Sequence, residues 1–224
     1  MKLRLRYKKE GLARFISHLD LVRTFERAFR RANLPIAFTQ GFSPRPKMTF
    51  APALSVGVTS SGEYLDAEFS QDVSVDDVAL KLNRALPQGI KVIDAKIANE
   101  SLALSMLNGA KYVVTVDLQD VEPEKLKEGI RSLLEQDELI IEKETKSGRK
   151  LVNIAPYIYH LDLLNSDAST ARIVMDIAIG QQGNVSPAAV IGELEKRLSS
   201  KLELLSIHRE ELFYISNDNK ILPM

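Results

Sequence analysis

The sequence contains no cysteine among its 224 residues. This absence excludes disulfide bonds, thiolate zinc sites, a cysteine nucleophile and iron–sulfur clusters held by the chain, and it fits a reducing compartment. Histidine is scarce as well, since only His18, His160 and His208 occur, and their spacing matches no metal-binding pattern. We therefore expect no metal site and no cofactor.

Long hydrophobic runs are also missing. No apolar stretch approaches the roughly 20 residues of a membrane span, and the N-terminus lacks the apolar centre of a signal peptide. The sequence therefore predicts a cytoplasmic protein with no membrane partner. Its 45% of hydrophobic residues suffices for one large globular core or two small ones.

The formal net charge is zero, but the charges are unevenly distributed. Residues 1–50 carry twelve basic and three acidic side chains, a balance of +9, so the remaining residues balance at −9. Such asymmetry favours a surface for an anionic partner, with nucleic acid as the leading candidate. The alternatives are a solvated charged face, or cations that pair with acidic residues of the later part of the chain.

A capped helix lies in the middle of this basic region. Ser17 followed by Asp20 is typical of a helix start, which makes His18 the first helical residue. The helix should end near Asn33, because Pro35 disfavours a helical conformation at the residue before it. Apolar residues recur along one side at helical spacing. The basic residues fall largely on the other side: Arg23, Arg27, Arg30 and Arg31.

The segment GFSPRPK, residues 41–47, follows this helix. Its two prolines remove backbone donors and its glycine favours a positive φ, which predicts a rigid exposed loop. The loop would present Phe42, Arg45 and Lys47. If it lay beside the helix start, a phosphate would meet the helix dipole, His18 and the loop cations together. Phe42 has two interpretations: it stacks on a base, or it fills the core beneath its own loop.

Residue patterns in the first half predict a ferredoxin-like domain. Residues 2–7 alternate basic and apolar side chains, which predicts a strand with one buried and one cationic face. The other expected strands lie near 35–40, 47–58, 63–69 and 90–98, and the helices near 17–33 and 74–86. The order is strand, helix, two or three strands, helix, strand. This is the βαββαβ pattern, in which two helices cover one face of an antiparallel sheet and leave the other available.

The order repeats in the second half, with helices at 122–134 and 186–198 and strands at 112–118, 139–143, 150–154, 157–164, 172–179 and 202–209. The sequence therefore predicts an α+β protein of two tandem ferredoxin-like domains with antiparallel sheets. Their limits would be residues 1–100, which carry the SHLD and GFSPRPK motifs, and residues 110–224. A single sheet through the whole chain is the competing arrangement.

Three segments resemble the signature of the radical-SAM-linked protein family: RFISHLD at 14–20, GFSPRPK at 41–47 and EYLD at 63–66. That family is a domain of unknown function found alone or on the C-terminal side of a radical SAM enzyme. The resemblance implies a physical or pathway link to a radical SAM protein and a context of RNA or translation chemistry. It supplies no catalytic residue.

Three hypotheses follow. The first is a non-catalytic RNA-binding or adaptor protein that works with a radical SAM enzyme. It would hold a polyanion through His18, Arg23, Arg27, Arg30, Phe42, Arg45 and Lys47. The second is an RNA-processing or RNA-modifying enzyme with His18 and Asp20 near the chemistry. The third is a module that binds an acidic protein or a small anionic ligand.

Overall fold

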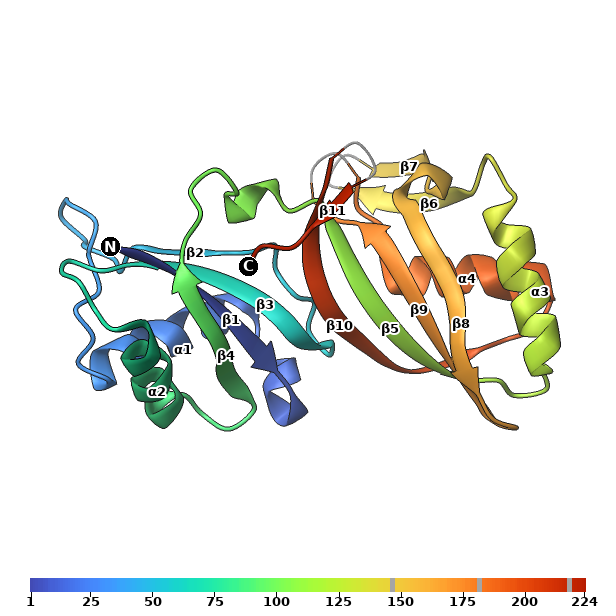
Figure 1. The fold of residues 1–224 in the computed structure, drawn as a ribbon. Helices are drawn as coiled ribbons and strands as arrows, with labels where there is room; N and C mark the ends of the chain where they lie inside the picture. The colour runs from blue at the N-terminus through green and yellow to red at the C-terminus, as the bar shows by residue number, and fades with distance from the viewer. Residues whose placement is uncertain (146–147, 181–182, 217–218) are drawn as a thin grey trace. The chain divides into compact units, whose positions relative to one another are not determined.

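The chain divides into two compact units. The computed structural model describes residues 1–145, 148–180, 183–216 and 219–224. Unit 1 comprises Met1–Leu107 and Glu211–Met224, and unit 2 comprises Asn108–Glu210. The described residues form four α-helices and mainly antiparallel β-structure, so the fold class is α+β (Figure 1).

The sheet of unit 1 is built around β1 (Lys2–Lys9). This strand pairs antiparallel with β3 (Thr59–Glu68) on one side and with β4 (Ile90–Ile97) on the other. The short strand β2 (Met48–Phe50) pairs antiparallel with β3. The strand order is therefore β4-β1-β3-β2.

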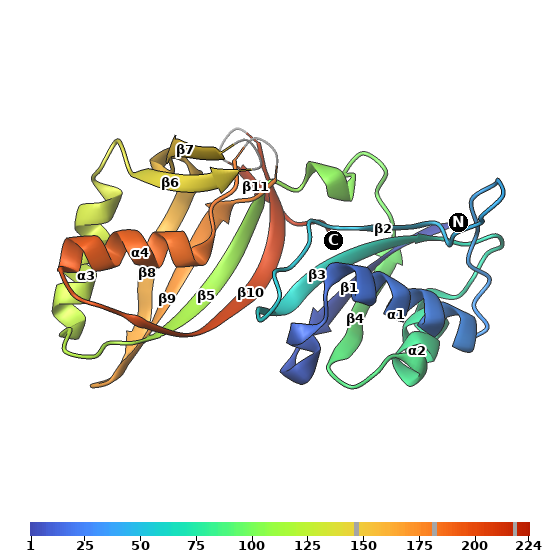
Figure 2. The ribbon, with the colours of Figure 1, turned by 180° about the vertical axis from the view of Figure 1, so that it is seen from behind.

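Two helices, α1 (His18–Arg31) and α2 (Val75–Ala85), cover one face of this sheet (Figure 2). The predicted start of α1 is confirmed, because the Ser17 hydroxyl accepts a hydrogen bond from the backbone N–H of Asp20 at 3.1 Å. The apolar side of each helix packs against the sheet. The core between the two layers includes Leu5, Leu21, Phe25, Phe29, Leu65, Val78 and Leu82.

The segment after α1 is less regular than the sequence predicted. Residues near 35–40 form isolated bridges instead of a strand, with Ile36 opposite Phe69 and Phe38 opposite Pro46. The strand expected over residues 47–58 ends at Phe50. Pro52 follows closely, and its ring nitrogen cannot donate to a strand ladder.

Unit 2 contains a second sheet region built around β5 (Gly109–Asp117) and β9 (Thr170–Ala178), which pair antiparallel. β8 (Ile158–Ser166) pairs antiparallel with the other edge of β9, and β10 (Glu203–Ser216) lies on the other edge of β5. The strand order is therefore β10-β5-β9-β8. The boundary between the two units falls within β10, at Glu210 and Glu211.

Two helices and a hairpin complete unit 2. α3 (Pro123–Leu134) contacts α4 (Pro187–Leu198) and β8. β6 (Ile140–Thr145) and β7 (Gly148–Asn153) form a separate antiparallel pair. The described residues also form three short 3-10 segments: Gly11–Phe15, Leu104–Met106 and Ala155–Tyr157. Among the described residues, no helix has the length and apolar character that crossing a lipid bilayer requires.

The end of the chain returns to unit 1. From Glu211 onward β10 belongs to this unit, where it pairs with β11 (Asn219–Ile221), and the backbone carbonyl of Pro223 accepts a hydrogen bond from Arg4 at 3.1 Å. The units thus differ from the expected domains, residues 1–100 and 110–224, in that the last fourteen residues group with the first part of the chain.

Candidate nucleic-acid interface

The arginines of α1 gather on one side of the helix. At 3.6 residues per turn, residues 23, 27, 30 and 31 fall within an arc of about 100°. The buried residues Leu21, Phe25, Ala28 and Phe29 lie on the opposite side, against the sheet. All four arginines are exposed. We call this surface the basic face of α1: Arg23, Arg27, Arg30 and Arg31.

The four arginines differ in their partners. Arg23 lies 3.5 Å from the carboxylate of Asp20, and the guanidinium of Arg31 donates to the backbone carbonyl of Ala85 in α2. The side chains of Arg27 and Arg30 make no hydrogen bond or ion pair with any residue that the structure describes. These two therefore have their donors available to an anion.

At the start of α1, the groups proposed for chemistry are engaged in local structure. Asp20 accepts a hydrogen bond from the Ser17 hydroxyl at 2.7 Å and also faces Arg23. The ring of His18 lies edge to face against Phe50, with 5.6 Å between ring centres. This environment is that of a helix cap and an aromatic contact, and it places no acid–base pair between His18 and Asp20.

The segment 37–47, which we call the proline loop, is a narrow hairpin. The backbone N–H of Thr39 donates to the carbonyl of Arg45 at 2.9 Å, and the N–H of Arg45 donates to the Thr39 hydroxyl at 3.0 Å. Lys47 closes the base by donating its N–H to Ala37 at 2.8 Å, while its ammonium group pairs with Glu68 at 2.9 Å. Lys47 is thus partly neutralised.

Phe42 lies at the tip of the proline loop and is fully exposed. Of its two interpretations, the one in which it fills the core beneath its own loop is wrong. The hairpin rungs hold the tip away from the core, and Gly41 with φ of 123° allows the chain to reverse there. The Arg45 side chain is also exposed and makes no ion pair with the described residues.

The base of the proline loop lies beside the C-terminal half of α1. A cavity of about 330 Å³ separates them, lined by Glu26, Arg30, Asn33, Leu34, Ile36, Phe38 and Pro46. We call it the loop cavity. His18 is the first residue of the same 14-residue helix, which spans about 20 Å. The loop therefore meets the end of the helix and not its start, so the N-terminal dipole does not face the loop cavity.

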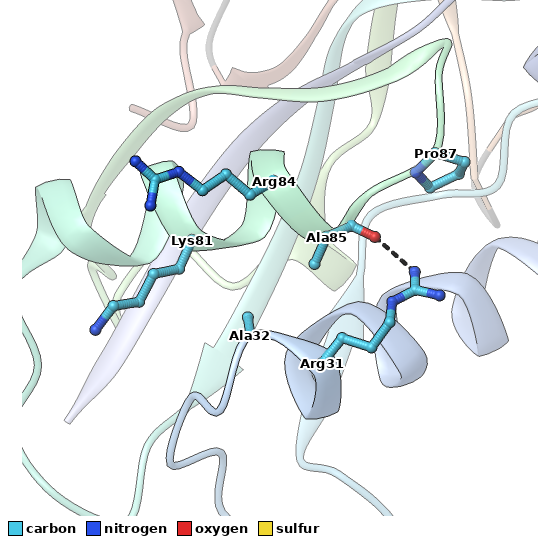
Figure 3. Close-up of a pocket in the computed structure, with 6 residues that line it drawn as sticks. All are labelled: Arg31, Ala32, Lys81, Arg84, Ala85 and Pro87. Atoms are coloured by element: carbon cyan, nitrogen blue, oxygen red, sulfur yellow. Dashed lines mark hydrogen bonds between the residues drawn. The ribbon is translucent and has the colours of Figure 1, made fainter.

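A second hollow lies between the C-terminal ends of α1 and α2 (Figure 3). Its volume is about 550 Å³, and its lining comprises Arg31, Ala32, Lys81, Arg84, Ala85 and Pro87. Lys81 lies 3.9 Å from Asp77, and the Arg84 side chain has no ion pair with the described residues. In Figure 3 the side chains of Lys81 and Arg84 extend in one direction, while Arg31 turns toward Ala85.

Sequence reasoning missed Lys81 and Arg84 as members of a basic surface. The count of charges covered residues 1–50, whereas these two cations belong to α2, which packs beside α1. Their spacing of three residues near the end of a predicted helix was the available signal, because it places both on one side of α2.

The cationic face expected for β1 is buried at Arg4 and half-buried at Lys2, Arg6 and Lys8. Arg4 is buried, with its Nε 2.7 Å from Oδ1 of Asp66, and it also donates to the carbonyl of Leu102 at 2.8 Å. Arg6 pairs with Glu211 at 2.7 Å. The expectation that this sheet face stays open is therefore wrong at Arg4, because the residues after β4 and the chain end cover it.

The positive charge of unit 1 is smaller than that of residues 1–50 alone. Unit 1 has 17 basic and 13 acidic residues, a balance of +4, and unit 2 has 13 and 17, a balance of −4. Part of the positive excess of residues 1–50 is thus offset by carboxylates from later in the chain, as one alternative anticipated. What remains exposed is concentrated on α1, α2 and the proline loop.

Within the part of the chain that the structure describes, no three side chains of His, Cys, Asp or Glu come together as metal ligands would. The exposed side chains described above are arginine, lysine and phenylalanine.

Comparisons with solved structures show similarity in fold. The structure described as "Crystal Structure of a Cbf5-Nop10-Gar1 Complex" matches with a TM-score of 0.55 and 12% identity, over 92% of this chain and 47% of the other. A structure of an H/ACA RNP bound to a substrate RNA containing 2'-deoxyuridine matches with a TM-score of 0.51 and 12% identity, over 92% of this chain and 46% of the other. The chain thus spans about half the length of the chains it matches.

No curated protein matches the sequence. Residues 2–187 match a family model described as "Uncharacterized protein conserved in bacteria (DUF2344)". This match extends through most of the 224 residues, including the proline loop and all of α1. The chain therefore belongs to this family of uncharacterized proteins conserved in bacteria.

Proposed function

We propose that this protein binds RNA, without catalysing a reaction on it, through the basic face of α1 and the proline loop. The observation that carries the proposal is that Arg27, Arg30 and Arg45 are exposed and make no ion pair with any described residue. Guanidinium groups in this condition bind phosphate oxygens with two parallel hydrogen bonds each. Phe42 and Lys47 of the proline loop would extend the same surface. His18, whose ring lies against Phe50 at the start of α1, would make a separate contact with the RNA.

Other observations support RNA as the anion. One of the structures similar in fold is an RNP bound to a substrate RNA. At 12% identity this supports a shared fold and leaves the ligand to be tested. Several cations lie along a helix and a loop, and this arrangement suits a ligand with repeated phosphates better than a ligand with a single charge.

We also propose that each unit is a ferredoxin-like domain. The strand orders β4-β1-β3-β2 and β10-β5-β9-β8 support this, because each places the first strand of a βαββαβ unit between the fourth and the third. In unit 2 the β6–β7 hairpin would then be an insertion between α3 and β8.

We further propose a radical SAM enzyme as the protein partner. This proposal is supported by the sequence resemblance alone. Its test is affinity purification of the full chain from its native host, with mass spectrometry of the bound proteins. Recovery of a radical SAM enzyme would support the partnership, and its absence from a purification that retains RNA would argue against it.

The RNA-binding proposal is tested by titrating a fluorescent RNA at several salt concentrations. The double variant Arg27→Ala/Arg30→Ala should lower the log–log salt slope by roughly 0.7 to 0.9 for each phosphate contact removed. A matched control is Lys127→Ala/Arg131→Ala, which removes two exposed cations from one side of α3 in unit 2. No binding by the wild-type protein at low salt would overturn the proposal.

The hollow between α1 and α2 favours a second candidate function. This hollow has a volume of about 550 Å³ and is lined by three cations, Arg31, Lys81 and Arg84. Such a lining suits a small anionic ligand such as a nucleotide phosphate. Calorimetry with nucleoside diphosphates tests it. Saturable binding that is lost in Lys81→Ala/Arg84→Ala and retained in Arg27→Ala/Arg30→Ala would select this function over RNA binding.

A further inference from the structure

The loop cavity combines apolar walls with free polar groups. Glu26 and Arg30 are four residues apart and share one side of α1, and Asn33 follows the end of this helix. None of these three side chains makes a hydrogen bond or ion pair with the described residues. Leu34, Ile36, Phe38 and Pro46 supply the apolar part of the lining.

Two aromatic rings accompany this cavity. Phe38 lines it and keeps half of its surface exposed, and Phe42 is fully exposed four residues later at the tip of the proline loop. The hairpin rungs between Thr39 and Arg45 hold both rings in one short rigid segment. Large aromatic groups that stay exposed on a rigid loop are suited to stacking against a flat ligand.

The charge of Glu26 restricts which chemical group can enter the cavity. A phosphate would be repelled by its carboxylate, whereas a neutral group with N–H donors would be bound by it. A nucleobase has flat apolar faces for Phe38 and Pro46, and a polar edge for Glu26 and Asn33. Its own phosphate would remain outside, within the field of Arg30 and Arg45.

Bases within an A-form duplex are stacked and cannot reach such a cavity. Proteins that read RNA bases mostly do so in single-stranded segments, where the bases can be splayed onto aromatic side chains. We propose that the loop cavity takes one unstacked base of single-stranded RNA while Phe42 stacks on a neighbouring base. This inference rests on the proposed RNA-binding function and adds the form of RNA that the site prefers.

The first experiment compares a 12-nucleotide single strand with the same sequence in a duplex, at equal salt. The wild-type protein should prefer the single strand. Phe42→Ala should weaken single-strand binding by about 5- to 100-fold, the range expected for loss of one stacked base, and should change duplex binding less than about 2-fold. Phe15→Ala, an exposed aromatic in the 3-10 segment Gly11–Phe15, is the matched control and should be silent.

The second experiment tests the polar edge. A carboxylate accepts hydrogen bonds from the amino groups of cytosine and adenine, each of which carries two N–H donors, whereas uracil offers only its single N3–H. Wild-type protein should therefore bind oligocytidylate more tightly than oligouridylate, and Glu26→Gln should reduce the difference. Both substituted side chains lie at the surface or beside a cavity, and circular dichroism should show an unchanged fold.

The outcomes separate the two proposals. Equal binding of single strand and duplex, together with a silent Phe42→Ala, would overturn this inference while RNA binding by the basic face of α1 stands. Failure of the wild-type protein to bind either RNA at low salt would overturn both. A loss of affinity in Phe42→Ala that is confined to the single strand would support the inference.

Discussion

The guanidinium group of Arg4 and the carboxylate of Asp66 form two parallel hydrogen bonds, from Nε to Oδ1 at 2.7 Å and from Nη2 to Oδ2 at 2.8 Å. The two side chains are only 1% and 3% exposed. The remaining donors of Arg4 reach the carbonyls of Leu102 and Pro223. This pair therefore ties adjacent strands to two later segments of unit 1.

Asp66→Ala should destabilise the protein by about 3–5 kcal/mol, because it leaves a buried guanidinium without its counter-charge. Urea unfolding followed by circular dichroism measures the change in the free energy of unfolding. The control is Glu68→Ala, which breaks the exposed pair with Lys47 on the same strand and should cost less than about 1 kcal/mol. Equal effects of the two substitutions would contradict the assignment of Arg4 as a structural residue.

Gly89→Ala should also destabilise unit 1. Gly89 has φ of 89°, and a Cβ there would lie 2.6 Å from the backbone oxygen of Glu10 and 2.9 Å from Cβ of Ala13. We expect a loss of about 1–3 kcal/mol in thermal or urea unfolding. Gly192→Ala, within α4 and free of close contacts, should instead stabilise by up to about 1 kcal/mol. A neutral Gly89→Ala would mean that this close approach is absent.

The turn between β8 and β9 should respond to acid through Asp167. Backbone N–H groups of Ser169 and Thr170 donate to its carboxylate at 2.9 and 2.7 Å, and these bonds lower the pKa of Asp167 to about 2. A lowered folded-state pKa means that the stabilisation is present above about pH 4 and is lost as the pH falls toward 2.

The measurement is the melting temperature of wild type and Asp167→Ala between pH 2 and pH 7. The difference between them should be constant above about pH 4 and shrink below it. Thr170→Val removes one further donor, the hydroxyl at 3.0 Å, and should give a smaller loss in the same pH range. A difference that grows on acidification would contradict the hydrogen-bond assignment.

The sequence predicts α1 closely. Its start at Ser17, its apolar stripe and the exposure of its arginines all follow from local rules, because capping and helical periodicity involve residues within a few positions of one another. The exposed character of the proline loop follows for the same reason, since prolines act on their own backbone and their neighbours.

Arg4 illustrates what local rules leave open. Its place in an alternating strand fits a solvent-facing cation equally well, and its burial depends on Asp66 and Pro223, which are 62 and 219 positions away. The loop cavity is similar. Phe38 lines the same cavity as Glu26 and Arg30 because the loop packs against the end of α1. The residues next to Phe38 in the sequence do not specify this packing.

The sequence by itself determined the α+β class, the limits of the main helices and the positive character of the early region, since composition and short-range periodicity carry that information. Only the tertiary structure decided which cations remain free. Burial pairs Arg4 and Arg6 with distant carboxylates and leaves Arg27, Arg30 and Arg45 without any. Whether a charge is available to a ligand depends on contacts between segments far apart in the chain, and those contacts exist only in the folded protein.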